Sequence, residues 1–192
     1  MVADLMFYSH PPAPQKRAFD LHEILRAVVA QSRDSVEGRG IELLVSPASQ
    51  SVTLAADRNM LLEAVRALVR NSIEAIGCDG RVQLACFCEA VGDGIPTGGV
   101  WPIAPPVGVP PSDLDTHSRP LAVVTVSDSG PGLSDAARIH AFDPYFSGRE
   151  AGRGLGVGLC RVERIVQLHG GAVTLQSGPA GCVARLWIPL GT

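Results

Sequence analysis

Apolar side chains recur every three or four positions over residues 57–76, and this spacing predicts an amphipathic helix. At about 100° per residue, these apolar positions fall within an arc of roughly 160°, which is the width of a core-facing stripe. The stripe consists of Leu61, Leu62, Val65, Leu68, Val69, Ser72, Ile73, Ala75 and Ile76. The opposite, solvated side carries Glu63, Arg66, Arg70 and Glu74. The same spacing predicts helices over residues 21–37 and 159–169.

Short apolar runs predict the strands. They lie at residues 41–45, 52–54, 81–88 and 121–126, and a terminal hairpin is expected from residues 172–176 and 182–188. Asp20, with Glu23 three residues later, is a suitable N-cap for the first helix, and Gly170 and Gly171 end the last one. Helices and mixed strands in this order predict an α+β fold, a two-layer sandwich in which one helical layer covers a mixed sheet.

Residues 91–119 fit no element, because they are rich in glycine and proline. They would form a long loop between two adjacent strands, where a few residues suffice. A surface insertion is one interpretation, since long loops cost little free energy. The other is a contact surface in which Trp101, Ile103 and Val107 are exposed apolar anchors.

Composition narrows the class of protein. The chain has 192 residues, of which 46% are hydrophobic and 18% charged, enough for one substantial core. The net charge of -3 gives no reason to expect nucleic-acid binding. No apolar run approaches the roughly 18 residues that span a bilayer, and no signal peptide is visible at the start. The five cysteines, an odd number without metal-like spacing, are typical of reduced cytosolic thiols.

The segment D-S-G-P-G-L at residues 128–133 follows the apolar run 121–126 and is the first candidate for chemistry. A strand that delivers a carboxylate into a turn with two glycines can form a compact nucleotide pocket. The Asp128 carboxylate can accept a hydrogen bond from an exocyclic amine, and Gly130 and Gly132 let the backbone approach a flat ring. An ordinary turn has the same residues, so this motif alone does not decide between the two.

Asn71 lies at the border of the apolar stripe of the 57–76 helix, between Ala67 and Ala75. Its side-chain oxygen is a neutral, hard ligand, suited to one position on an Mg²⁺ ion that keeps several waters and takes phosphate oxygens. A helix-end hydrogen bonder or a tolerated surface residue is the other interpretation of Asn71.

Glycines alternate with other residues from 152 to 158 and lead directly into the helix predicted at 159–169. A glycine loop that enters a helix N-terminus offers free N–H groups and the positive end of the helix dipole to an anion. A mobile linker is the alternative, but Leu155, Val157 and Leu159 interleave the glycines. The aromatic residues in 142–149 suit a lid that packs when closed, although Phe142 itself is expected to pack in the core.

Taken together, these segments resemble the ATP-binding domain of sensor histidine kinases, in the gyrase, Hsp90, histidine kinase and MutL superfamily. The N box is similar to residues 68–75, the G1 box to 128–133, the F box to 142–147 and the G2 box to 154–159. Residues 165–171 also match the family's pattern, and the resemblance spans residues 19–190. It implies a Bergerat-type fold and transfer of the γ-phosphoryl group of ATP, with Mg²⁺, to a histidine.

The resemblance also implies a role for each matching residue. Asp128 would read the adenine amine, Asn71 would hold Mg²⁺, and Arg149 would act with Asn71 in catalysis by reaching the γ-phosphate. The other nucleotide contacts expected are Ala75, Gly130, Gly132, Leu133, Phe146, Arg153, Gly154, Leu155, Gly156, Val157, Gly158 and Leu159. Gly154, Gly156 and Gly158 would articulate a lid over the phosphates.

Two positions depart from the family pattern. Ala67 stands where many members carry a second asparagine and where the ATPase branches carry a general-base glutamate. An alanine in place of that general base argues against direct activation of water by this chain. Arg149 stands where a lysine is usual, and either cation can reach a phosphate with a different geometry.

Residues 1–18 are expected to be the end of a dimerisation helix and a Pro-rich linker, and residues 19–192 the kinase domain. His22 begins a superficially acceptor-like H-E-I-L-R, but it lacks the following proline, so the acceptor histidine is expected upstream of this fragment. His169, at a helix end, is a position that favours a cation.

The expected partners are the histidine-bearing dimerisation domain and a response regulator receiver domain, without nucleic acid or membrane contact. The expected location is the cytoplasm, with a parent protein that can be membrane-anchored elsewhere. Two alternatives stay open: an anti-sigma-type serine/threonine kinase and a nucleotide-binding module without transfer activity.

Overall fold

A mixed β-sheet forms one layer of the molecule. The computed structural model describes residues 11–47, 50–89, 107–108, 120–146 and 156–190. Among them the strand order is β2-β4-β6-β8-β7-β5, in which β2 runs parallel to β4 and the other pairs are antiparallel. The strands are β2 (Ile41–Val45), β4 (Gly80–Glu89), β6 (Leu121–Asp128), β8 (Gly181–Pro189), β7 (Ala172–Gly178) and β5 (Val107–Gly108). A separate antiparallel pair joins β1 (Arg17–Asp20) to β3 (Thr53–Ala56).

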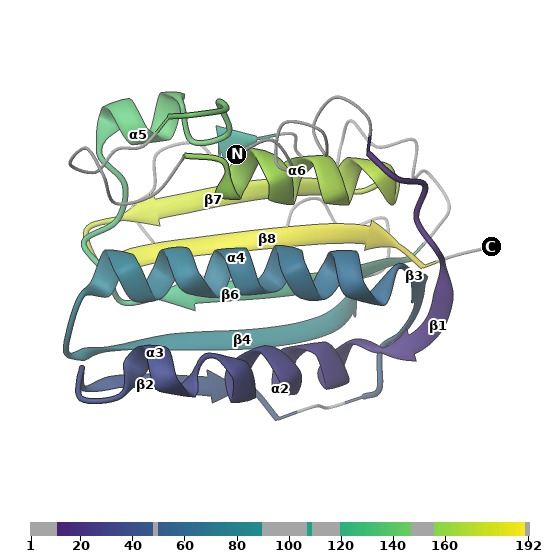
Figure 1. The fold of residues 1–192 in the computed structure, drawn as a ribbon, viewed down its shortest axis with the longest axis horizontal. Helices are drawn as coiled ribbons and strands as arrows, with labels where there is room; N and C mark the ends of the chain where they lie inside the picture. The colour runs from purple at the N-terminus through teal and green to yellow at the C-terminus, as the bar shows by residue number, and fades with distance from the viewer. Residues whose placement is uncertain (1–10, 48–49, 90–106, 109–119, 147–155, 191–192) are drawn as a thin grey trace.

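Three helices form the second layer and cover one face of this sheet, as Figure 1 shows. They are α2 (Leu21–Gln31), α4 (Arg58–Ile76) and α6 (Gly158–Leu168); α3 (Arg33–Val36) and α5 (Asp135–Ile139) are short. The core lies between the layers, where alternate strand residues meet the helix stripes. Its members include Val82, Val124, Val126 and Leu186 from the strands and Leu25, Val65, Val69, Val162 and Ile165 from the helices. The predicted two-layer α+β sandwich is therefore confirmed.

The elements differ from the sequence expectations in several places, including β5 within the segment expected to hold no element and the short helix α5. The first helix ends at Gln31 and only a short turn of helix, α3, follows, because residues 32–35 are polar and carry no stripe to bury. The strand β1 was not expected, and it forms because its residues 17–20 pair with 53–56. The strand β6 continues to Asp128 itself, since that residue pairs with Val82 and Cys182.

Two aspartates cap helices through their side chains. Asp20 accepts the backbone N–H of His22 at the start of α2, as expected, and Asp57 accepts those of Asn59 and Met60 at the start of α4. Burial acts to raise the pKa of Asp57, but these donors and the N–H of Gln15 outweigh it and hold the pKa below its ordinary value. The caps fix where both helices begin.

The sheet face turned away from the helices carries a second apolar cluster, consisting of Leu121, Val123, Ala172 and Trp187. Of the Gly/Pro-rich segment, the structure describes only β5, which pairs with β7 at the sheet edge. Trp101, Ile103 and the side chain of Val107 lie outside the description, so the two interpretations of residues 91–119 stay predictions. Within the described ranges, no helix combines the length and apolar character that crossing a membrane requires.

Candidate nucleotide site

The carboxylate of Asp128 is the most constrained polar group at one end of the sheet. Its Oδ1 accepts the N–H groups of Gly130 and Cys182 at 3.0 and 3.2 Å, and its Oδ2 accepts the hydroxyl of Ser72 at 2.8 Å. Burial raises the pKa of Asp128 above its ordinary value, while these hydrogen bonds act in the opposite direction. The strand end therefore holds a half-buried carboxylate in one orientation, with its acceptor capacity only partly used.

The glycines after Asp128 are required by close contacts. Gly132 has φ 78°, and a methyl group placed on it would lie 2.3 Å from the carbonyl oxygen of Gly178. A methyl group on Gly130 would lie 3.0 Å from Oδ1 of Asp128. The next N–H, that of Leu133, donates to Oγ of Ser177 at 2.6 Å. The turn is thus held closely between β6 and the β7–β8 hairpin.

The predicted metal ligand Asn71 lies where α4 faces the N-terminus of α6. A methyl group placed on Gly158 would lie 3.7 Å from Oδ1 of Asn71. Val157 precedes the helix and cannot cap it, and none of the described side chains does so. The N–H groups of the first turn of α6 therefore lie near the Asn71 amide, and anion binding there stays a prediction of the glycine pattern.

The prediction that Ala75 belongs to the core-facing stripe of the helix is wrong. Ala75 is exposed, although the angular reading assigns it to the core-facing arc. The side chain of Ala75 lies beside the glycine turn, where a methyl group on Gly130 would lie 3.6 Å from the Cβ of Ala75. The other expectation for Ala75, a contact with the nucleotide, stays a prediction.

The aromatic segment before the glycine loop packs against the start of α6. The backbone N–H of Tyr145 donates to the carbonyl of Gly156 at 3.0 Å, and Gly156 has φ 65°. A methyl group on Gly156 would lie 2.5 Å from the carbonyl oxygen of Phe146, so only glycine fits there. Phe142 packs on the core, as expected, and Phe146 is half-buried.

The structure thus brings most predicted site residues together at one end of the sheet. Ala75, Asp128, Gly130, Gly132 and Leu133 lie at or beside the turn after β6, and Asn71, Phe146, Gly156, Val157, Gly158 and Leu159 lie at or beside the start of α6. Arg149, Arg153, Gly154 and Leu155 lie outside the described residues, and their roles stay predictions.

Sequence reasoning missed residues that support this site. Ser72 holds Asp128, and the only signal was a hydroxyl on an otherwise apolar stripe. Ser177 holds the glycine turn from β7, which no local pattern indicates. A cavity of about 190 Å³ was also missed. It lies across the strand ends and is lined by Arg81, Gln83, Ser127 and Gln176, whose side chains alternate with core residues and so face away from the helices.

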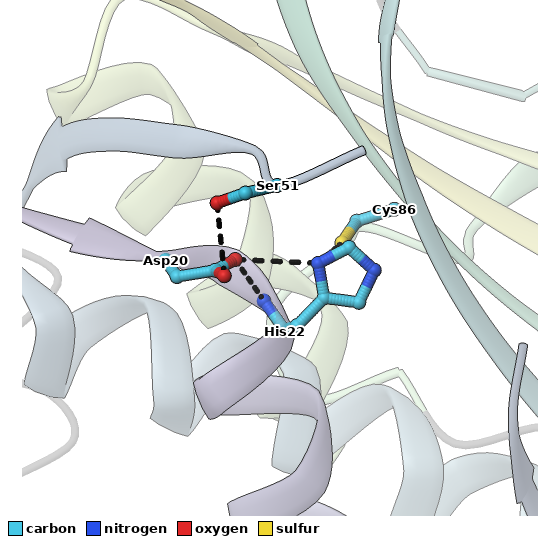
Figure 2. A network of polar contacts seen from close by, with 4 residues as sticks. All are labelled: Asp20, His22, Ser51 and Cys86. Carbon is cyan, nitrogen blue, oxygen red and sulfur yellow. Dashed lines mark hydrogen bonds and ion pairs between the residues drawn. The ribbon is translucent and has the colours of Figure 1, made fainter. Parts of the chain in front are cut away.

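The histidine at position 22 is buried, with 3% of its surface exposed. Figure 2 shows its ring beside Asp20, whose Oδ1 lies 3.2 Å from Nδ1, while Ser51 donates to the same carboxylate. Cys86 Sγ lies 3.4 and 3.5 Å from the two ring nitrogens, so the sulfur is aimed at neither. Burial also raises the pKa of Cys86 to about 12, so this Cys–His–Asp group is not an activated nucleophile.

His169 lies at the helix end where a cation is favoured, and its ring is enclosed by two backbone partners. The ring is buried at the end of α6, where Nε2 accepts the backbone N–H of Asp57 at 3.0 Å and Nδ1 lies 2.7 Å from the carbonyl of Ile165. His169 therefore joins α4 to α6 as a structural hydrogen bonder.

Comparison with known proteins identifies the family. Residues 56–192 match the family described as histidine kinase-, DNA gyrase B-, and HSP90-like ATPase, and the chain belongs to it. It is 25% identical over 191 residues to the sensor histidine kinase ZraS of Klebsiella oxytoca, covering 99% of this chain and 35% of that protein. It is 26% identical over 181 residues to the sensory histidine kinase/phosphatase NtrB of Rhodobacter capsulatus, covering 92% of this chain and 44% of NtrB.

Solved structures agree on the fold. The catalytic domain of histidine kinase ThkA has a TM-score of 0.67 at 21% identity, covering 92% of this chain and 96% of that one. Full-length ShkA in complex with AMPPNP has a TM-score of 0.73 at 21% identity, covering 100% of this chain and 35% of ShkA. The chain thus has the fold of histidine kinase catalytic domains and spans about a third of the length of ZraS, and these comparisons give no support to the serine/threonine kinase or binding-module alternatives.

Proposed function

We propose that this member of the histidine kinase-, DNA gyrase B-, and HSP90-like ATPase family transfers the γ-phosphoryl group of ATP, with Mg²⁺, to a histidine outside the chain, on the dimerisation helices of its own kinase. The observation that carries the proposal is the half-buried Asp128 carboxylate, held by Ser72 at the glycine turn. Asn71 and the uncapped N-terminus of α6 lie at the same end of the fold. This arrangement supports a nucleotide with its base at Asp128 and its phosphates near Asn71 and α6.

Asp128 favours adenine over guanine for a simple reason. A carboxylate only accepts hydrogen bonds, so it pairs with the exocyclic amine of adenine and repels the carbonyl that guanine has there. Ser72 occupies one acceptor position of Oδ2, and each carboxylate oxygen has two. The adenine amine therefore has a position available without displacing Ser72.

Asn71 suits Mg²⁺ because a carboxamide oxygen is a neutral, hard donor that leaves room for waters and phosphate oxygens. The ion, when bound, neutralises charge on the phosphates. Asn71 would orient it, the N–H groups of α6 would hold phosphate oxygens, and Arg149 and Arg153 would reach the γ-phosphate. Gly154 and Leu155 would complete the lid. Catalysis of this kind is mostly positioning and charge neutralisation.

The remaining expectations follow from this assignment. Residues 1–18 would connect the domain to the dimerisation helices that carry the acceptor, and a response regulator would receive the phosphoryl group next. The similar kinase ThkA has been solved in complex with such a partner, the response regulator protein TrrA. A kinase that uses ATP would place this domain in the cytoplasm.

The test supplies the chain with Mg²⁺, γ-radiolabelled ATP and the dimerisation domain of its own kinase. We expect acid-labile, base-stable phosphate on the dimerisation domain and none on this chain, and Asn71→Ala should abolish the transfer. Acid-stable label on a serine or threonine would favour the anti-sigma type of kinase. ATP binding without any transfer would favour the binding module.

A further inference from the structure

Arg70 precedes Asn71 in α4, and the structure directs its guanidinium toward the start of α6. The sequence pattern places Arg70 on the solvated side of the helix, and its side chain is 63% exposed. A methyl group placed on Gly158 would nevertheless lie 3.4 Å from Nη2 of Arg70. The same methyl group would lie 3.7 and 3.8 Å from the amide atoms of Asn71.

The described neighbours of the guanidinium leave it available to a ligand. Its Nε lies 3.9 Å from Oε1 of Glu74, a long and exposed ion pair of the kind that contributes little free energy. The guanidinium has five N–H donors in a fixed fork, and this contact involves one of its nitrogens. The rest of the group points along α4 toward the first turn of α6.

Three features therefore converge on the first turn of α6: the Arg70 cation, the Asn71 amide and the N–H groups of a helix that no described side chain caps. Two of the three favour an anion, and Asn71 can ligate the ion that accompanies one. Asp128, the group proposed to read adenine, accepts the hydroxyl of Ser72, the residue that follows Asn71 in α4. A nucleotide with its base at Asp128 would direct its phosphates toward the first turn of α6.

We propose that Arg70 contacts the terminal phosphates of the bound nucleotide and so makes the site discriminate ATP from nucleotides with fewer phosphates. This inference rests on the proposed function, because it takes the nucleotide to lie between Asp128 and α6. A guanidinium binds phosphate oxygens through two parallel hydrogen bonds, a geometry that an ammonium group does not reproduce.

The experiment measures the dissociation constants of ATP and AMP, with Mg²⁺, for the wild-type chain and for three variants. Arg70→Gln should weaken ATP about tenfold and change AMP less than about twofold, because a lost charged hydrogen bond affects only the nucleotide that reaches it. Arg70→Lys should recover part of the ATP affinity. Arg66→Gln, an exposed arginine one turn earlier on the same helix, is the matched control and should change neither constant.

The results distinguish a failure of the Arg70 inference from a failure of the proposed function. The inference would be overturned if Arg70→Gln had the same ratio of ATP to AMP affinity as the wild type. This holds whether both dissociation constants change together or neither changes. Because ATP binding by the wild-type chain is measured first, its absence would overturn the proposed function, and the inference with it. Unchanged thermal unfolding of Arg70→Gln would exclude a merely structural role.

Discussion

At the scale of single residues, the site depends on the carboxylate of Asp128. Each hydrogen-bond donor that the structure describes around it can also form a hydrogen bond with an asparagine side chain. Asp128 receives two backbone N–H groups on one oxygen and a hydroxyl on the other. An asparagine oxygen can accept the same two N–H groups, and the Ser72 hydroxyl can reverse and accept from the new NH₂ group. The fold therefore tolerates the substitution, whereas an adenine amine meets a donor in place of an acceptor.

We accordingly expect Asp128→Asn to weaken ATP binding by about 1–3 kcal/mol and to change the free energy of unfolding by less than about 1 kcal/mol. Titration calorimetry and chemical denaturation measure the two quantities. Ser72→Ala is the control, because it removes one donor to Asp128 and keeps the carboxylate. Equal ATP affinity for Asp128→Asn and the wild type would show that Asp128 does not read the base.

Cysteine reactivity offers a pH-dependent probe of the same position. Burial, with the nearby Asp128 charge, raises the pKa of Cys182 to about 12, and burial raises that of Cys86 to about 12 as well. Both thiols therefore stay protonated at neutral pH, and their alkylation rates should rise about tenfold per pH unit between pH 7.5 and 9.5. The pKa of each thiol is higher in the folded chain than in the unfolded one, so the stability that these thiols contribute is lost as pH rises above about 9.

Saturating ATP with Mg²⁺ should slow alkylation of Cys182, whose backbone N–H binds Asp128, and leave Cys86 unchanged. Cys86 is the internal control because its pKa is similar and it lies beside His22, away from the turn. Mass spectrometry of the alkylated peptides reports both rates. Protection of both thiols or of neither would contradict the placement of the nucleotide at Asp128.

At the scale of elements, two glycines two residues apart differ in what they require. Gly156 has φ 65° and its Cβ position is blocked by the backbone of residues 145–146. Gly158 begins α6 in an ordinary helical conformation, and a methyl group there would make normal contacts with Arg70 and Asn71. Gly156 is therefore needed by the fold, whereas Gly158 leaves the position between α4 and α6 without a side chain.

Gly156→Ala should therefore destabilise the fold by about 2–4 kcal/mol, since it combines backbone strain with a steric clash. Gly158→Ala should be neutral or stabilising by up to about 1 kcal/mol, because alanine is the better helix former. The same Gly158→Ala variant should weaken ATP, since its methyl group occupies the gap that faces the phosphates. Denaturant unfolding and ATP titration distinguish the two variants, and unchanged ATP affinity in Gly158→Ala would move the phosphates elsewhere.

At the scale of the whole molecule, the sequence predicted the layers well and the contacts between them poorly. The stripe of α4 and the strand 121–126 followed from periodicity, and Asp128 and Asn71 followed from motif chemistry. The angle around a helix, however, says only which side is apolar. It assigned Ala75 to the core, because it could not know that the last turn of α4 passes the turn after β6. It placed Arg70 in solvent correctly, but it could not indicate that the guanidinium lies near the start of α6. Ser177 needed the tertiary fold itself.

The molecule also has a second end, where α4 begins and α6 finishes. There His169 accepts the N–H of Asp57, whose carboxylate receives the N–H of Gln15 from the segment before β1. Since α4 and α6 run in opposite directions, this junction and the nucleotide site hold the same two helices at opposite ends (Figure 1). Removing the His169–Asp57 contact should therefore change the stability of the fold without changing the nucleotide site.

His169→Ala should lower the free energy of unfolding by about 2–4 kcal/mol, because it leaves a cavity and a buried N–H of Asp57 without its acceptor. At temperatures where the variant stays folded, its ATP affinity should match the wild type within about twofold, since no nucleotide contact is removed. Gln167→Ala, an exposed change on the same helix, is the control and should stay within about 0.5 kcal/mol. This expected result is the reverse of that for Asp128→Asn, which should weaken ATP binding and leave the free energy of unfolding nearly unchanged. A His169→Ala variant that unfolds like the wild type would mean that the two helices are held together by the apolar core alone.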